Sequence, residues 1–417
     1  MQNLNYKTEA ILFDNVQFIY ELQLAKLELQ NLNINHEITN DLKKIKIQLD
    51  TLHPSNEKIE HAKKRVSYFK KINNELTHYF YITQKNQTRS SNQYLTHWFY
   101  PYKGKFHPQM IRALLNIANI KENETILDTF SGSGTTLLEA QILNINSIGI
   151  DISPLCVIQS KVKTESIYEI KEIKELKNEI INFITNQFSP SLNKSSPDKT
   201  NNLYYTYLDK LTKNEKVKNF YILAKLIALS DYTRRKKFFL DSFSKNVNKM
   251  ILSLENFNEI KQILNLNLAN TKIENSDSRK INLPDNSIDG IITSPPYSIA
   301  LDYIKNDNHA LQELECNPYE IKNNFIGIRG KEKEKIKLYY EDMMQCYKEM
   351  YRVLKQNKYA VIIIGNATYQ GKEIKIVEFT IDYMQKIGFE LYQNIDKIIF
   401  GLYNVMKKEN ILIFKKV

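Results

Sequence analysis

The sequence predicts an α/β fold: a seven-stranded mixed sheet, preceded by a helical N-terminal region and interrupted by a helical insertion. Short apolar runs of strand length recur between stretches in which apolar residues follow the spacing of a helix. The last two runs, near 389–400 and 409–417, flank a connection that begins at Gly401. They are therefore expected to form a hairpin that gives the sheet an antiparallel end.

These patterns divide the chain into three parts. The predicted strands lie at 125–128, 147–150, 271–275, 288–292, 359–366, 389–400 and 409–417. The core then comprises 96–156 and 271–417. Residues 1–95 are expected to be mostly helical after a short strand at 10–13, with a long second helical stretch at about 57–85. Residues 157–270 carry isoleucines at helical spacing and form the helical insertion.

Composition and charge narrow the class of protein. Hydrophobic residues make up 42% of the 417 residues, which supports a buried core. The formal charge of +11 favours a polyanionic partner, with nucleic acid first and an anionic membrane second. The three cysteines are far apart, so neither a zinc site nor a disulfide framework is indicated. Because no apolar run approaches the ~20 residues that a bilayer requires, a cytoplasmic protein without a membrane partner is expected.

The stretch Thr-Ser-Pro-Pro-Tyr at 293–297 directly follows the apolar run 288–292. Two consecutive prolines prevent the strand from continuing in the sheet. The backbone must turn out there, which holds a hydroxyl, carbonyls and an aromatic ring at the strand end. Open α/β sheets place their chemistry at such strand ends.

A second group of residues follows the strand at 125–128. Glycines at 132 and 134 allow a tight turn into a helix and a close approach of the backbone to a ligand. The next strand ends in Asp151, an acid that can accept hydrogen bonds from ribose hydroxyls. The third glycine of the dinucleotide fingerprint is missing, which disfavours a nicotinamide cofactor.

These segments resemble the motifs of the amino-group DNA methyltransferases. The turn at 293–297 resembles motif IV, 128–136 resembles motif I, and 149–151 resembles motif II. Residues 275–279 look like motif III, and the proline-punctuated aromatic loop 96–108 is similar to motif X. The resemblance covers roughly half the chain and implies a class I Rossmann-like methyltransferase core that binds S-adenosyl-L-methionine.

By this resemblance each matching residue takes an expected role. The catalytic residues would be Ser294, Pro295, Pro296 and Tyr297. The cofactor-binding residues would be Phe106, His107, Pro108, Asp128, Phe130, Ser131, Gly132, Gly134, Thr135, Asp151 and Asp277. The Ser294 hydroxyl and the Pro295 carbonyl would localise the lone pair of an exocyclic amine. Tyr297 would stack on a base that has left the duplex.

Serine at 294 favours the N4 amine of cytosine, with adenine N6 as the first alternative. C5-cytosine methylation is disfavoured because none of the cysteines forms the Pro-Cys pair that it needs. A tRNA guanine-N2 methyltransferase is a further alternative, since the opening of the chain faintly resembles the RNA-binding region of that family. That family, however, usually has Asp at the position of Ser294. A non-catalytic DNA-binding protein on this scaffold is the remaining alternative.

The expected partner is double-stranded DNA, together with a cognate restriction endonuclease, and the expected state is a monomer or weak dimer. Residues 201–250 hold eleven Lys or Arg against four Asp or Glu. The nucleic-acid-binding candidates within them are Arg234, Arg235, Lys236 and Lys237, which aromatic residues flank. The segment 305–336 is the alternative recognition region. The insertion between motifs II and III departs from the simplest motif orders, which leaves the location of target recognition open.

Overall fold

The computed structural model describes residues 7–38, 43–48, 55–85, 92–102, 104–187, 201–296, 303–330, 332–369, 371–398 and 408–417. Within these ranges the main sheet has seven strands in the order β13-β14-β10-β9-β6-β7-β8, which confirms the predicted mixed sheet. Its strands are β6 (Thr125–Asp128), β7 (Asn146–Asp151), β8 (Thr271–Asn275), β9 (Ile288–Thr293), β10 (Leu354–Ile364), β13 (Phe389–Ile398) and β14 (Lys408–Lys416). Strands β8, β7, β6, β9 and β10 are parallel, and β14 pairs antiparallel with β10 and β13.

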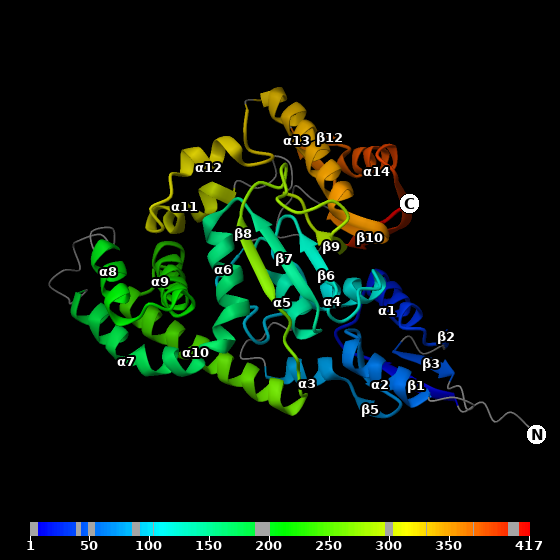
Figure 1. Ribbon diagram of the computed structural model, residues 1–417, viewed down its shortest axis with the longest axis horizontal. Coiled ribbons are helices and arrows are strands. Elements are labelled where there is room, and N and C mark those ends of the chain that lie inside the picture. The colour runs from blue at the N-terminus through cyan, green and yellow to red at the C-terminus, as the bar shows by residue number, and fades with distance from the viewer. Residues whose placement is uncertain are drawn as a thin grey trace, which may run out of the picture.

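Helices cover both faces of this sheet (Figure 1). They are α4 (Pro108–Ile117), α5 (Thr135–Ile142), α6 (Pro154–Glu165), α13 (Glu332–Val353) and α14 (Ile376–Lys386). The side chains of β10 alternate between two cores: Val361 and Ile363 pack with α4, whereas Ile362 and Ile364 pack with α13 and α14. Because successive side chains of a strand point to opposite faces, a strand buried on both sides reads as a continuous apolar run.

The N-terminal region differs from the expectation of a mostly helical segment. Within the described ranges its helices accompany a five-stranded antiparallel sheet in the order β2-β3-β1-β4-β5. The elements are β1 (Lys7–Leu12), α1 (Ile19–Asn31), β2 (His36–Ile38), β3 (Lys44–Gln48), α2 (Ser55–Arg65), β4 (Phe69–Ile72), β5 (Glu75–Leu76) and α3 (His78–Gln84). The predicted helix at 57–85 is therefore two helices separated by a hairpin, whose turn uses Asn73 and Asn74 at positive φ.

The insertion forms a helical layer on the left of the core sheet in Figure 1, and the end of its last helix lies next to α3 of the N-terminal region. Its elements are η1 (Ser166–Tyr168), α7 (Ile170–Gln187), α8 (Asn201–Leu211), α9 (Glu215–Arg235) and α10 (Phe239–Ile263). Ile173, Ile180 and Ile184 of α7 are buried in one cluster with α9 and α10. The isoleucines that the sequence placed at helical spacing thus belong to a hydrophobic core within the insertion.

Shorter elements follow the main strands. They are α11 (Tyr303–Glu313), α12 (Pro318–Asn324), β11 (Ala367–Tyr369) and β12 (Lys372–Ile374). Helix α11 packs against α9 and α6, so the segment after β9 joins the insertion to the core. No helix in the described part of the chain is long and apolar enough to cross a membrane.

A buried carboxylate, Glu139 of α5, ties the loop 92–106 to the core. It accepts hydrogen bonds from the Tyr94 hydroxyl (2.6 Å), from His97 Nε2 (2.8 Å) and from an Arg112 nitrogen (3.4 Å). Burial lowers the pKa of His97 to about 4, so the ring is neutral. Burial alone would raise the pKa of Glu139, but the hydrogen bond from His97 and the charge of Arg112 hold it below its usual range.

We predict that Glu139→Ala destabilises the protein by about 3–5 kcal/mol, because it leaves the buried Arg112 without its carboxylate partner. Glu175→Ala is the control, since the Glu175 side chain is 61% exposed and its 4.0 Å pair with Lys171 lies on a helix surface. Its expected change in unfolding free energy is below about 0.5 kcal/mol. Chemical denaturation measures both, and similar midpoints for the two variants would contradict the assigned role of Glu139.

Candidate active site

A cavity lies at the carboxyl ends of β6, β7, β8 and β9, and its empty space, with the solvent at its open mouth included, is about 790 Å³. The described residues that line the cavity are Tyr102, Gly104, Lys105, Phe106, Phe130, Ser131, Gly132, Ser133, Thr135, Asp151, Ile152, Ser276, Asp277, Ser278, Ser294, Pro295, Pro296, Asn324, Phe325 and Ile326. Four of the predicted motifs and the loop that resembles motif X therefore meet at one site.

In the turn after β6, the backbone of Gly132 lies at the cavity wall, because this residue has no side chain. The Gly132 amide donates to Asp151 Oδ2 at 2.8 Å, and the Ser131 amide donates to the Ile150 carbonyl at 2.9 Å. Gly132 has a φ of +49°, and a Cβ on it would lie 3.3 Å from the Tyr102 ring. Both facts favour glycine at this position, as the sequence pattern predicted.

Two residues that were predicted to bind the cofactor, Gly134 and Asp128, do not line the cavity and instead stabilise this turn. Gly134, with a φ of +73°, precedes α5, and a Cβ on it would lie 2.7 Å from the Ser160 hydroxyl of α6. Asp128 is fully buried at the end of β6, and the Thr293 hydroxyl donates to its Oδ1 at 2.7 Å. The Phe130 amide donates to the same Asp128 oxygen at 3.2 Å and to Thr293 Oγ1 at 3.1 Å. Burial raises the pKa of Asp128 to about 6.

Asp151 ends β7 beside the turn. Its Oδ1 accepts the Ser153 amide at 2.9 Å, while its Oδ2 accepts Gly132. Burial raises the pKa of Asp151 to about 6, although both amide hydrogen bonds act in the opposite direction. At neutral pH the group is a carboxylate with capacity for further donors, which fits the ribose hydroxyls of S-adenosylmethionine.

Asp277 follows β8 and pairs with Arg279, whose Nε lies 3.0 Å from each carboxylate oxygen. Arg279 also donates to the buried Asp342 of α13 at 2.9 Å and to the Asn324 carbonyl at 3.0 Å. Arg329 Nε donates to Asp342 at 2.8 Å. These contacts hold the segment 324–330 against the cavity. Arg329, which lies in the segment 305–336 predicted as the alternative recognition region, is thus paired with a buried carboxylate of the protein.

Ser294, Pro295 and Pro296 leave β9 along the cavity wall, so the predicted catalytic turn faces the same space as the glycine turn. Thr293 before them is fully buried, Pro295 is buried and Ser294 is half-buried. Tyr297 lies outside the described residues.

The loop before α4 contributes only in part as expected. Phe106 lines the cavity. His107 occupies the N-cap position of α4 without a side-chain capping hydrogen bond, and Pro108 is the first residue of that helix, where a missing amide hydrogen costs little. Burial lowers the pKa of His107 to about 4, so its imidazole is neutral. Its position is that of a structural residue at the helix start.

Three of the four predicted nucleic-acid contacts are paired with carboxylates. Arg234 lies 2.9 Å from Asp307, whereas Arg235 and Lys237 lie 3.1 Å and 2.9 Å from the buried Asp231. Lys236 ends α9 in the left-handed conformation, with a φ of +56°. The run therefore closes the α9–α10 turn, with its side chains still exposed to solvent.

Sequence reasoning missed half of the cavity wall. The missed lining residues are Tyr102, Gly104, Lys105, Ser133, Ile152, Ser276, Ser278, Asn324, Phe325 and Ile326. Most lie inside the segments that resemble motifs X, I and III, and Ile152 directly follows motif II, so the segments were identified although no role was assigned to these residues. Asn324, Phe325 and Ile326 carried no local signal, because distant ion pairs place them. In the described part of the chain, no cluster of three His, Cys, Asp or Glu side chains could hold a metal ion.

The sheet order, the glycine turn and the acid at the end of β7 define an S-adenosylmethionine-dependent methyltransferase. The chain belongs to the family described as RMKL-like, methyltransferase domain, whose model matches residues 99–315. A second family model, described as DNA methylase, matches residues 4–162. The resemblance to the amino-group DNA methyltransferases is thereby confirmed.

Individual relatives agree with this class. The chain is 35% identical over 144 residues to the type II methyltransferase M.MjaII of Methanocaldococcus jannaschii, which covers 32% of this chain and 26% of that protein. It is 27% identical over 337 residues to the type II methyltransferase M.BsoBI of Geobacillus stearothermophilus, with 67% and 63% covered. A tRNA (guanine(10)-N2)-dimethyltransferase of Methanothermobacter thermautotrophicus is 30% identical over 77 residues, with 18% and 22% covered. The chain spans less than two thirds of the length of each of these relatives.

The raised pKa of Asp151 predicts a pH dependence of cofactor binding. Above about pH 6 the group is a carboxylate that can accept ribose hydroxyls, and below it the protonated group loses acceptor capacity. The affinity for S-adenosylmethionine should therefore fall several-fold from pH 7 to pH 5. Calorimetric titration measures this, with Asp151→Asn as a control that binds weakly at both pH values. A wild-type affinity that does not change over this range would contradict the assignment.

Proposed function

We propose that this protein methylates DNA, transferring a methyl group from S-adenosylmethionine to the exocyclic N4 amine of cytosine in duplex DNA. The observation that carries the proposal is the shared cavity: the Ser294–Pro296 turn lines the same space as Gly132 and Asp151. The type II methyltransferases among its relatives support a role in a restriction-modification system with a cognate endonuclease. A monomer or weak dimer belongs to the same proposal.

The residues of the turn would act on the amine. The lone pair of an exocyclic amine is delocalised into the ring, which makes the amine a poor nucleophile. Hydrogen bonds to the Ser294 hydroxyl and the Pro295 carbonyl would localise that lone pair on nitrogen and hold it in line with the reacting carbon. S-adenosylmethionine, when bound, supplies an electrophilic methyl group. Because the amine can lose its proton after the transfer, the chain needs no strong general base.

The target base must leave the duplex to reach a cavity at the strand ends. Tyr297, by its place in the sequence, would stack on that base. The choice of cytosine N4 over adenine N6 rests on serine at position 294, and adenine N6 is the alternative that keeps the same residues and the same chemistry.

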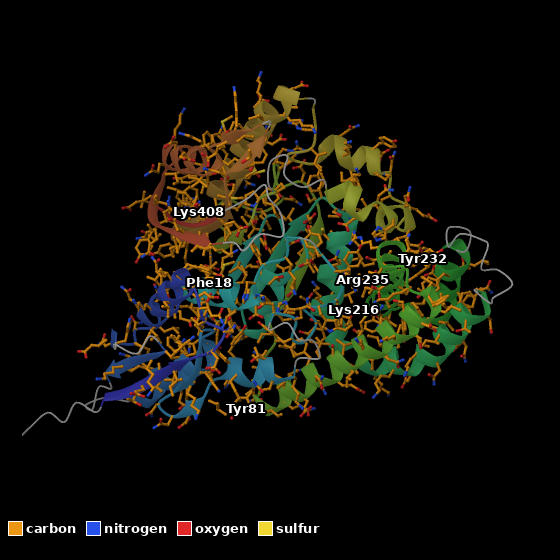
Figure 2. All side chains as sticks on the ribbon, turned by 180° about the vertical axis from the view of Figure 1, so that it is seen from behind. Phe18, Tyr81, Lys216, Tyr232, Arg235 and Lys408 are labelled. Atoms are coloured by element: carbon orange, nitrogen blue, oxygen red, sulfur yellow. The ribbon has the colours of Figure 1, made fainter. Side chains whose placement is uncertain are left out.

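The surface for DNA would include the α9–α10 turn. Arg235 and Tyr232 lie near one another on the surface of the insertion, as Figure 2 shows, and the Arg235 and Lys237 side chains are 60% and 49% exposed. Asp231 offsets part of this charge locally. The remaining support is the formal net charge of +11 over the whole chain, which favours binding to the phosphate backbone of a nucleic acid.

A tRNA guanine-N2 methyltransferase is the second candidate. The short match to a tRNA (guanine(10)-N2)-dimethyltransferase favours it, as does a folded N-terminal sheet region that could serve as a separate RNA-binding unit. Serine at 294, where that family usually has Asp, speaks against it.

We predict that the purified protein incorporates labelled methyl groups into mixed-sequence duplex DNA as N4-methylcytosine. Ser294→Ala should lower the rate by about 10²-fold or more, because it removes one of the two groups that hold the amine. Ser287→Ala is the matched control, since the Ser287 hydroxyl only bonds the Pro284 carbonyl in a turn outside the cavity lining. Digestion and identification of the methylated nucleoside give the readout.

Detection of N6-methyladenine in the DNA would agree with the proposed catalytic site but would contradict the choice of cytosine as the target base. Methylguanine in tRNA with none in DNA would decide for the second candidate. Equal rates for the Ser294→Ala and Ser287→Ala variants would contradict the catalytic role of Ser294.

A further inference from the structure

The two helices that follow β9 enclose a groove outside the cofactor cavity. Helix α11 packs against α12 (Figure 1), and side chains of both helices line the groove between them. Lys305, Asn308 and Gln312 come from α11, whereas Tyr319 and Lys322 come from α12. The groove thus presents two lysines, two side-chain amides and an aromatic ring, and none of its described lining residues is acidic.

The two acidic side chains of α11 face the insertion instead of the groove. Asp307 pairs with Arg234 of α9 at 2.9 Å, and the buried Glu313 pairs with Lys225 of the same helix. Both acids are therefore neutralised within the protein. Lys305 is exposed on the groove side of α11. This separation of charge favours a polyanion in the groove.

Helix α12 shows a similar arrangement. Its acid, Glu320, lies outside the groove lining and accepts a hydrogen bond from Asn317 Nδ2 at 3.1 Å. Lys322 is exposed in the groove, and Tyr319 is 78% exposed. An exposed tyrosine beside a lysine can stack on a base or a sugar whose phosphate the lysine binds.

The groove is joined to the cofactor cavity through the end of α12. Asn324, the last residue of this helix, lines the cavity together with Phe325 and Ile326, and Lys322 lies one position before its neighbour in the groove lining. Arg279 donates to the Asn324 carbonyl at 3.0 Å, which holds this end of α12 at the cavity. A strand that places one base in the cavity therefore has its neighbouring nucleotides beside the groove.

The groove also has the length of a short run of nucleotides. From Lys305 to Gln312 the helix rises by ~10 Å. Phosphates of one DNA strand are spaced by ~3.4 Å along the helix axis, so this length corresponds to about three nucleotides. Lysines bind phosphates without regard to sequence. Side-chain amides such as those of Asn308 and Gln312 can donate to and accept from base edges, which distinguishes one base from another.

We propose that the groove between α11 and α12 binds the nucleotides of duplex DNA that flank the target base. In this arrangement Lys305 and Lys322 contact phosphates, while Asn308 and Gln312 contact base edges and contribute to sequence specificity. The proposal rests on the proposed function, because it takes DNA as the substrate and the cavity as the place of the target base.

The role of the lysines is tested by the binding of labelled mixed-sequence duplex DNA to the full chain, measured by fluorescence anisotropy at several salt concentrations. Lys305→Met and Lys322→Met should each weaken binding about threefold to tenfold at low salt and lower the slope of log K against log salt concentration by about 1. Lys171→Met is the control and should bind DNA like the wild type. The Lys171 side chain is 92% exposed, and it follows Tyr168, which contacts Gln141 near the end of α5 that is remote from the cavity.

The role of the amides is tested with duplex DNA whose positions around the target base are randomised. The methylated molecules are sequenced, which gives the base preference at each flanking position. Asn308→Ala and Gln312→Ala should each reduce the preference at one of the positions next to the target by about tenfold. Asn178→Ala, a change of an exposed asparagine on α7, is the matched control and should keep the wild-type preference.

The possible outcomes separate this proposal from the proposed function. DNA methylation by the wild type with unchanged affinity and salt slope in both lysine variants would overturn the groove and leave the proposed function intact. An equal loss in Lys171→Met would also overturn it, because any surface lysine would then contribute. An unchanged flanking preference in both amide variants, or none in the wild type, would contradict the role of the amides.

Binding decides the matter even if the wild type methylates no DNA. Weaker DNA binding by both lysine variants, but not by Lys171→Met, would then support the groove while the proposed function fails. Weaker binding of tRNA with unchanged binding of DNA would overturn the groove as a DNA site.

Discussion

The site depends on one buried hydrogen bond, from the Thr293 hydroxyl to the Asp128 carboxylate at 2.7 Å. Strands β6 and β9 are parallel neighbours, so their carboxyl ends lie side by side. Asp128 precedes the glycine turn, and Thr293 precedes the Ser294–Pro296 turn that we propose contacts the amine. The Phe130 amide donates to both side chains, which fixes the two turns against each other. Methyl transfer needs the donor and the acceptor in line, and this contact joins the two segments that we propose hold them.

The other parts of the chain extend this arrangement. Glu139 anchors the loop that carries Lys105 and Phe106, and the same Arg112 that reaches Glu139 also donates to backbone carbonyls of α2 in the N-terminal region. On the opposite wall, Asp342 accepts hydrogen bonds from Arg279 and Arg329. These contacts hold the segment 324–330 over the cavity. Each of these carboxylates is buried and multiply hydrogen-bonded, so the cavity wall is built from long-range contacts as well as from strand ends.

The strand ends and the turns after them could be predicted from the sequence, because an apolar run that stops at Asp128, Asp151 or Thr293 is a local signal. Features that depend on contacts between distant residues could not be predicted from the sequence. The ion pair of Arg234 with Asp307 joins residues far apart in the chain, so Arg234 was expected to be available for DNA. The N-terminal sheet was missed because its strands are short and lysine-rich, and their pairing is set across the region by β1.

A double-mutant cycle on Asp128 and Thr293 tests this account most directly. Asp128→Asn, Thr293→Val and the double variant would be compared with the wild type for the affinity for S-adenosylmethionine, with unfolding free energies measured in parallel. If the hydrogen bond joins the two turns, each single change weakens binding and the double variant is about as weak as the weaker single one, with a coupling of about 0.5–3 kcal/mol. Losses that simply add would show that the two residues act independently and would contradict the account.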